Sequence, residues 1–276
     1  MNHFITNKSK LMSFEEYLKR QNLSENTILA YASAIAVFFH KHEKISQTEL
    51  NNYRDFLLKK YSPKTVNLKI QGINRYLSFI HKEKLQLKFV KIQQKTYLEN
   101  VISEQEYLIL KNRLKTDGKI KWYFIVWFLA ATGLRVGELV KLHVQDIHKC
   151  YMEIYSKAQK CRRVYIPQKL YCELFKWLAS ENRKSGFLFT NRFGSQLTTR
   201  GIAIQLKTYA NEYGINPVVV HPHSFRHFFA KQFLQKCPDI TFLADLLGHE
   251  NLATTRIYLR RTSDEQQQLV NKTVTW

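Results

Sequence analysis

Apolar residues recur three and four positions apart through the first part of the chain, which is the spacing of one buried helix face. Short polar residues and a proline interrupt this pattern at intervals, where they can cap or begin helices. The pattern predicts a small helical domain over residues 1–83. Its helices are predicted over 14–20 behind a Ser13–Glu16 capping box, after Ser24 or Asn26, over 48–60 and from Pro63 onward, so that about 12 residues precede the first helix.

The helical period is lost over residues 84–101, where lysines are spaced through Leu, Phe, Val and Ile. This pattern is typical of an extended, basic linker between two domains. An ordinary solvated connector explains the same residues equally well, so both interpretations stay open. Lys84 and Lys88 are among the lysines of this segment.

A second domain over residues 102–276 mixes helices with a short hairpin. Ser103 and Glu106 form a capping box, and the apolar run at 122–131 predicts a buried helix. The fold class predicted for the whole chain is mainly α with a small β-sheet. Strands are predicted over 151–155, 163–166 and 188–190, and further helices from Thr198 to about Tyr213, over 224–235, 239–247 and 252–259, and after Ser263.

The charge of the chain adds a function class to this picture. Among its 276 residues, 43 Lys and Arg outnumber 22 Asp and Glu, which gives a formal net charge of +21. Residues 1–95 hold 17 basic and 7 acidic side chains, and the remainder holds 26 and 15. A field this positive attracts polyanions, of which nucleic acid is the commonest, although a lysine-rich surface that serves solubility is the alternative. The even division favours a polyanion gripped by both domains.

Several other function classes are disfavoured by the sequence. The start of the chain has no apolar run typical of a signal peptide, and the longest apolar stretch falls far short of the roughly 20 residues that a membrane span needs. The four cysteines form no CxxC pair, so we expect free thiols in a reducing cytoplasm. Since no phosphate-binding glycine loop and no acidic cluster occurs, we expect no metal and no other cofactor.

Two arginines stand where they would suit anion binding. A turn at Pro222 places His223 at a helix start, and Arg226 follows three residues later on the same face. Arg135 directly follows the most apolar helix and needs an anionic partner, for which Glu138 is the candidate. Each feature has a structural alternative, namely a solvated His and Arg in the first case and an Arg–Glu pair in the second.

A histidine and a tyrosine near the C-terminus form a third candidate. His249 follows a tight turn, and Tyr258 comes nine residues later. Arg256, Arg260 and Arg261 bracket this tyrosine, so its hydroxyl would lie in a positive field. The alternative is a tyrosine whose ring packs in the core while its hydroxyl is hydrated.

Taken together, these segments resemble the tyrosine recombinase (phage integrase) family in order and spacing, in its simple two-domain form. The resemblance covers about residues 100–262, and the domain over 1–83 is similar to the family's helical core-binding domain. Residues 84–101 would then be the basic linker, and 102–276 the catalytic domain with a C-terminal tail. The matching residues are Thr132–Leu139 (TGLRVGEL), the hairpin with Lys157, His223–Arg226 (HSFR), Leu247–His249 (LGH) and Tyr258.

The resemblance implies a role for each matching position. Tyr258 would attack a DNA phosphate and form a 3′-phosphotyrosine. Arg135 and Arg226 would bind the non-bridging phosphate oxygens, and His223 and His249 would hydrogen-bond the phosphate or move protons. Charged side chains would thus neutralise the transition state, which many phosphoryl-transfer enzymes do with metal ions.

The same resemblance makes Lys157 the residue that protonates the leaving 5′-oxygen. The hairpin reads Ser156-Lys157-Ala158-Gln159-Lys160, whereas the family often has Gly-Lys-Gly, so Lys160 is a rival for this role. A covalent tyrosine intermediate conserves the phosphodiester energy, so that resealing needs no ATP.

The resemblance implies that the partner is double-stranded DNA with a specific recombination site. It also implies a homo-tetramer on that DNA and no membrane. We expect the C-terminal tail to be exchanged between protomers, and a tail that folds back on its own domain is the alternative. The alternatives are a type IB topoisomerase-like nicking-closing enzyme and a catalytically inactive DNA-binding protein. We expect DNA contacts from Lys59, Lys60, Lys64, Lys69, Arg75, Lys84, Lys88, Lys160 and Arg256.

Overall fold

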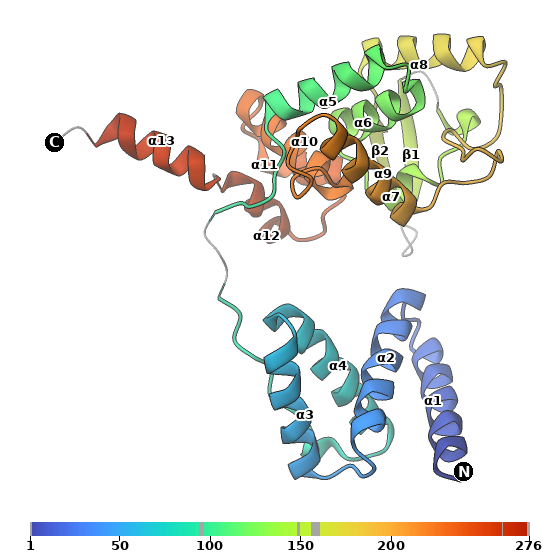
Figure 1. The fold of residues 1–276 in the computed structure, drawn as a ribbon, viewed down its shortest axis with the longest axis vertical. Coiled ribbons are helices and arrows are strands. Elements are labelled where there is room, and N and C mark those ends of the chain that lie inside the picture. The colour runs from blue at the N-terminus through green and yellow to red at the C-terminus, as the bar shows by residue number, and fades with distance from the viewer. Residues whose placement is uncertain (1, 94–96, 148–149, 156–160, 261, 275–276) are drawn as a thin grey trace. The chain divides into compact units, whose positions relative to one another are not determined.

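The structure is a computed structural model that describes residues 2–93, 97–147, 150–155, 161–260 and 262–274 (Figure 1). The chain divides into two compact units, Met1–Gln94 and Lys95–Trp276. Each unit has its own hydrophobic core. Helices dominate both units, and the described part of the second adds one two-stranded sheet. The predicted fold class, mainly α with a small β-sheet, is thereby confirmed.

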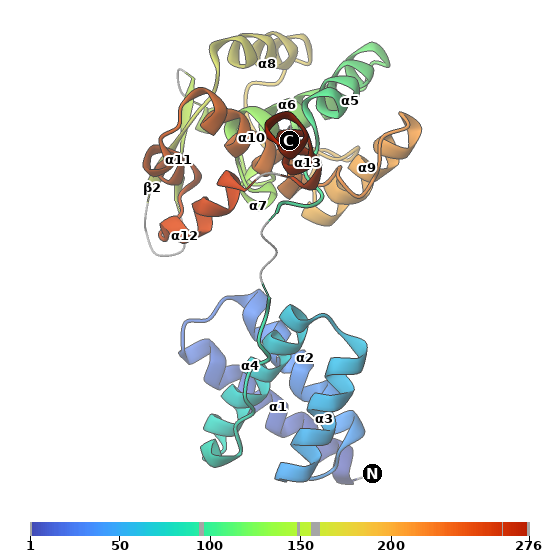
Figure 2. The same cartoon turned by 90° about the vertical axis from the view of Figure 1, so that its left-hand side faces the viewer.

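The N-terminal unit is a helical bundle whose inward faces form its core (Figure 2). Ser24 caps the second helix as predicted, and Pro63 occupies the first position of the fourth. Phe14, Phe38 and Tyr53 come from three different helices and are fully buried. The elements are α1 (Asn2–Arg20), α2 (Glu25–Lys41), α3 (Gln47–Lys60), α4 (Pro63–Phe79) and the short 3-10 helix η1 (Glu83–Leu85).

The first helix begins earlier than predicted. α1 starts at Asn2, so Ser13 lies inside it, and the expectation that about 12 residues precede the first helix is wrong. No Gly or Pro interrupts this stretch, and Leu11 packs with Phe14 and Leu18 against the bundle. Contact with the core therefore extends the helix past a serine and a glutamate that match a capping box only locally.

Two asparagines of α4 hold the chain that leaves the bundle. The Asn74 side chain donates to the carbonyl of Leu87 and accepts from its N–H, both at 2.9 Å. Asn67 makes the same pair of hydrogen bonds with Val90, at 2.9 and 2.8 Å. Leu87 is consequently buried. Residues 83–90 therefore form part of the surface of the bundle.

The C-terminal unit is organised around α6 (Ile120–Thr132). Phe124, Ile125 and Val126 are consecutive residues and so point in different directions from this helix, and each is at most 3% exposed. α10, α5 and α8 pack against it. The apolar run is thus a core helix, and none of the helices within the described ranges is long and apolar enough to cross a membrane. The other helices are α5 (Glu104–Thr116), α7 (Val136–Leu139), η2 (Val144–Asp146), α8 (Gln168–Ser180), α9 (Thr199–Glu212), α10 (Pro222–Lys236), α11 (Ile240–Leu247), α12 (Leu252–Thr255), η3 (Arg256–Leu259) and α13 (Ser263–Thr273).

The sheet is the predicted hairpin of β1 (Tyr151–Tyr155) and β2 (Cys161–Tyr165). The strands are antiparallel, with Met152 opposite Val164, and both of these side chains are buried. The predicted strand over 188–190 is wrong: Thr190 makes only an isolated bridge with Gln196, because no neighbouring segment of the described chain pairs with it continuously. The hairpin tip, residues 156–160, lies outside the described residues.

Candidate active site

A left-handed glycine turns the chain out of the core helix toward the site. Gly133 ends α6 with φ +64°, and a Cβ there would lie 2.5 Å from the ring of Phe229. This turn brings Arg135 to the N-cap position of α7. Glu138 accepts hydrogen bonds from the backbone N–H of Arg135 at 2.8 Å and from its Nη1 at 3.1 Å, so the predicted Arg–Glu pair is confirmed.

Arg226 is the buried cation of the site. It lies on α10, is 1% exposed, and donates from Nη1 to the carbonyl of Gly133 and from Nη2 to that of Leu247, both at 2.6 Å. Burial, with the charge of Arg135, lowers its pKa to about 10, against an opposing effect of Tyr258. Since this value is well above 7, Arg226 keeps its positive charge, and its bonds fix it between the ends of α6 and α11.

His249 is held in one tautomer by its two neighbours. Its Nε2 lies 2.9 Å from Nη2 of Arg226, and its Nδ1 lies 2.8 Å from Oγ1 of Thr255. A guanidinium can only donate, so Nε2 accepts and Nδ1–H donates to Thr255. Burial and the charges of Arg226, Arg135 and Arg162 lower the pKa of His249 to about 4, so the ring is neutral at pH 7.

Tyr258 lies in an aromatic setting and is 4% exposed. Its ring stacks on that of His249 with centroids 6.0 Å apart, and it meets the ring of His227 edge-on at 5.0 Å. The tyrosine also interacts with the Arg226 guanidinium. The ring of Tyr258 therefore packs in the core, as in the alternative considered from the sequence, and it also lies beside Arg226.

The start of α10 supplies the remaining histidines. His221, two residues before His223, caps the helix by accepting from the N–H of Ser224 at 3.1 Å, which is a structural role. His223 is exposed, but its partial loss of hydration, followed by the charge of Arg226, lowers its pKa. His227 contacts the His223 ring, and burial lowers its pKa to about 4. At neutral pH these histidines are uncharged, and the positive charge rests on the arginines.

The structure brings together Arg135, His223, Arg226, His249 and Tyr258 from four segments of the C-terminal unit, because His223 and Arg226 share α10. Lys157 and Lys160 lie outside the described residues. A cavity of about 560 Å³ opens beside Arg135 and His249, whereas Tyr258 borders a second one of about 540 Å³. No group of His, Cys, Asp or Glu within the described ranges is arranged to hold a metal ion.

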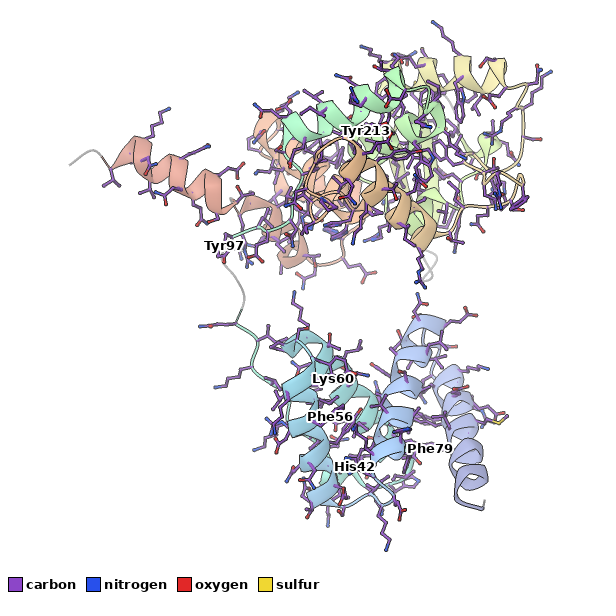
Figure 3. All side chains as sticks on the ribbon, in the orientation of Figure 1. His42, Phe56, Lys60, Phe79, Tyr97 and Tyr213 are labelled. Carbon is purple, nitrogen blue, oxygen red and sulfur yellow. The ribbon has the colours of Figure 1, made fainter. Side chains whose placement is uncertain are left out.

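The other predicted DNA contacts belong to both units of the chain. Arg256 is exposed on η3, and the lysines and arginine of the N-terminal unit are exposed on α3, α4 and the segment after them, except Lys69, which is half-buried. Lys60 lies over the Phe56 ring at 5.7 Å (Figure 3). The N-terminal residues concerned are Lys59, Lys60, Lys64, Lys69, Arg75, Lys84 and Lys88.

Sequence reasoning missed two residues that contact the site. Arg162 of β2 binds Glu138 through both carboxylate oxygens, at 2.9 and 2.7 Å. Thr255 is fully buried against His249. Thr255 lies three residues before Tyr258, and this helical spacing predicts that the two side chains share one face. The spacing was therefore the signal that could have found Thr255.

Two family models match the chain. Residues 100–265 match the phage integrase family, and residues 11–84 match the phage integrase N-terminal SAM-like domain. Among curated proteins, tyrosine recombinase XerA of Pyrococcus furiosus is 32% identical over 271 residues, which cover 95% of this chain and 93% of that protein. Tyrosine recombinase XerC of Leptospira interrogans is 28% identical, with 94% and 91% covered.

Solved structures share the fold. A crystal structure of XerA recombinase has a TM-score of 0.56 at 25% identity and covers 96% of this chain and 98% of its own. The site-specific recombinase XerH, bound to its difH substrate before cleavage, has a TM-score of 0.71 at 20% identity, with 94% and 84% covered.

Proposed function

The chain belongs to the phage integrase family of tyrosine recombinases, and we propose that its site cuts and rejoins double-stranded DNA with Tyr258 as the nucleophile. The resemblance drawn from the motifs is thereby confirmed as to family. The observation that carries the assignment of roles is the position of Tyr258, which lies against Arg226 and His249.

In the proposed reaction the Tyr258 oxygen forms a bond to phosphorus while the bond to the 5′-oxygen breaks. The products are a 3′-phosphotyrosine and a free 5′-hydroxyl. The tyrosine proton leaves through a neutral histidine, for which exposed His223 is suited by its lowered pKa. Lys157 protonates the leaving oxygen, with Lys160 as the rival. Resealing reverses these steps.

The two arginines have different parts in this proposal. Arg226 is fixed by backbone carbonyls, so it offers a preorganised charge that needs no rearrangement when the phosphate arrives. Arg135 has a side chain that is 46% exposed, so part of its guanidinium can meet an incoming phosphate. Paired N–H donors suit phosphate oxygens better than a single ammonium group does.

We further propose a division of labour along the chain: a core-binding domain over 1–83, a linker over 84–101 whose first residues are held on the bundle by Asn67 and Asn74, and a catalytic domain over 102–276. The specific recombination site, the homo-tetramer and the cytoplasmic, nucleoid-associated location are parts of the same proposal. Exposed Leu269 and Val270 on α13 support a tail that is exchanged between protomers, since apolar side chains on a terminal helix gain by burial. In the chain itself, Glu265 of this helix pairs with Lys231 of α10.

Two variants test the nucleophile. DNA that the protein binds is first selected from a random-sequence pool, and a nick is placed near the cleavage point so that the cut strand diffuses away. Wild type should accumulate a covalent protein–DNA adduct, and Tyr258→Phe should form none, while Tyr213→Phe should behave as wild type. An adduct with Tyr258→Phe would refute the assignment.

The same DNA separates the alternatives. A topoisomerase would relax supercoiled plasmid as a monomer without any selected site, whereas a recombinase exchanges strands only between two such sites. A catalytically inactive DNA-binding protein would bind the selected DNA and form no adduct at all. The retention of Arg135, His223, Arg226, His249 and Tyr258 disfavours this last alternative.

A further inference from the structure

Arg162 is a largely buried arginine beside the site that the proposed reaction does not use. It lies on β2, and its side chain is 13% exposed. Its Nη1 donates to Oε1 of Glu138 at 2.9 Å, and its Nη2 donates to Oε2 at 2.7 Å. Two parallel bonds of this kind fix both the position and the orientation of the carboxylate.

The same carboxylate holds Arg135. Oε1 of Glu138 also accepts from Nη1 of Arg135 at 3.1 Å, and Oε2 accepts from its backbone N–H at 2.8 Å. Burial alone would raise the pKa of Glu138, but hydrogen bonds and charge from Arg162, followed by those from Arg135, lower it. Glu138 is therefore a charged carboxylate shared by two arginines.

The Arg162 side chain also lies against the turn that carries His249. A Cβ at Gly248 would lie 2.7 Å from Cδ and 3.1 Å from Nη1 of Arg162. Gly248 has φ +64°, a backbone conformation that glycine adopts readily. The arginine stem thus runs in close contact with this turn, and a side chain at Gly248 would displace it.

We propose that Arg162 is a positioning residue for DNA cleavage. Through Glu138 it orients Arg135 toward the scissile phosphate. Through its contact with Gly248 it also fixes the position of Arg135 relative to the turn that carries His249. The inference rests on the proposed function of this site. It assigns Arg162 no contact with the reacting atoms. Arg162 thereby connects β2, the second strand of the hairpin, to Arg135 and His249, which are two of the proposed phosphate ligands.

The charges explain why a second arginine is needed. Without Arg162, the half-buried Glu138 carboxylate would have Arg135 as its main counter-charge and would compete with the DNA phosphate for it. With Arg162 present, the carboxylate is neutralised from the other side, and the Arg135 guanidinium is left for the phosphate. A lysine at 162 would keep the charge but has no fork to hold both oxygens.

The rate of covalent adduct formation on the nicked, selected DNA tests this. At saturating DNA, Arg162→Ala should slow the rate by on the order of 100-fold, as for a misplaced catalytic group, and Arg162→Lys should slow it by about 10-fold. The dissociation constant for the DNA should change by less than about 3-fold, since the phosphate contacts elsewhere remain. Arg163→Ala is the matched control: this neighbour on β2 pairs with Glu153, lies over Tyr151 and should leave the rate unchanged.

Two further measurements separate positioning from folding. Arg162→Ala should add nothing to the loss caused by Glu138→Gln, because both act through one carboxylate. DNA with a methylphosphonate at the scissile position lacks one non-bridging charge, so it should restore part of the rate to Arg135→Ala and Arg162→Ala alike. If Arg162→Ala unfolds by circular dichroism, the same measurements are made with Arg162→Lys.

Three results would overturn the inference: a wild-type rate for both Arg162 variants, a loss confined to DNA affinity, or a loss that adds fully to that of Glu138→Gln. If wild type itself forms no adduct on any selected DNA, the proposed function fails instead. The two failures are therefore distinguishable in one experiment.

Discussion

At the scale of single residues, the site is a set of shared hydrogen bonds between groups that the sequence keeps far apart. The pair of Arg135 and Glu138 could be predicted because three residues separate them on one helical turn. Arg162, the other partner of Glu138, could not be predicted, because no periodicity relates a residue of β2 to one of α7. The burial of Arg226 was equally hidden, since its carbonyl partners belong to the ends of two other helices.

The hydroxyl of Thr255 should be needed to hold His249 in its tautomer. Thr255→Val keeps the shape of the side chain but removes the acceptor for Nδ1–H, while Thr255→Ser keeps it. We expect the valine variant to lose about 10-fold in the rate of adduct formation and the serine variant to stay near wild type. Nitrogen-15 chemical shifts of the His249 ring report the tautomer directly. Unchanged shifts and rate in Thr255→Val would show that Arg226 alone orients the ring.

The partly buried histidines His227 and His249 should make the C-terminal unit sensitive to acid. Burial lowers the pKa of His227 from 6.5 to about 4, so between these values the unfolded chain binds more protons than the folded one. The free energy of unfolding should therefore fall as the pH drops from about 6.5 toward 4, by at most about 3 kcal/mol for His227, with a further loss from His249.

Urea unfolding at a series of pH values measures this dependence. Trp122, Trp127, Trp177 and Trp276 all belong to the C-terminal unit, so tryptophan fluorescence reports on that unit alone. His227→Gln should flatten the slope between pH 4 and 6.5. His40→Gln, at an exposed position of the other unit, should leave it unchanged. An identical slope in wild type and His227→Gln would contradict the prediction.

At the scale of elements, the sequence was sufficient to predict those helix ends whose hydrogen bonds join residues close together in the chain. The Ser103–Glu106 capping box and the Ser24 cap are confirmed, because each is made within a few residues. Elements that depend on distant partners were predicted less well. Contact with the core extends α1 to Asn2, and 188–190 forms no strand because no continuous partner is present among the described residues.

The turn at Gly133 should be more sensitive to substitution than its backbone conformation alone requires. Gly133 and Gly118 have nearly the same φ, +64° and +67°, but a Cβ at Gly133 would lie 2.5 Å from Phe229, whereas nothing lies within 4 Å of one at Gly118. Gly118→Ala should lower the free energy of unfolding by about 1 kcal/mol through strain in the left-handed region. Gly133→Ala should lower it by about 3 kcal/mol because the Phe229 ring must also move.

Tryptophan fluorescence in urea compares the two variants, and Gly118→Ala serves as the control for backbone strain. Gly133→Ala should in addition slow adduct formation, since the Gly133 carbonyl holds Arg226 and the turn places Arg135. Equal losses of stability in both variants would show that the close approach to Phe229 relaxes without effect.

At the scale of the whole molecule, the net charge of +21 divides between two tasks under the proposed function. A few charges act at one phosphate: Arg135 and Arg226 in the described structure, and the hairpin lysines beyond it. The rest would bind the DNA backbone, an interaction that depends on salt and carries little sequence information. These tasks are separable by experiment, because loss of a backbone contact lowers the affinity for DNA, whereas loss of a group in the site lowers the rate of adduct formation.

The salt dependence of DNA binding should therefore follow the position of lysines and not the net charge alone. Lys59→Gln with Lys64→Gln removes two exposed lysines proposed to contact DNA, and Lys19→Gln with Lys44→Gln removes two other exposed lysines of the same unit. Removing one lysine–phosphate interaction should reduce the slope of log K against log salt by about 0.9, so the first pair should reduce it by about 2 and the second pair by none. Fluorescence anisotropy of a labelled duplex measures the slope, and the adduct rate at saturating DNA should be unchanged in both double variants. Equal reductions would mean that bulk charge, not a defined DNA-binding surface, governs affinity, because both pairs change the net charge by the same amount.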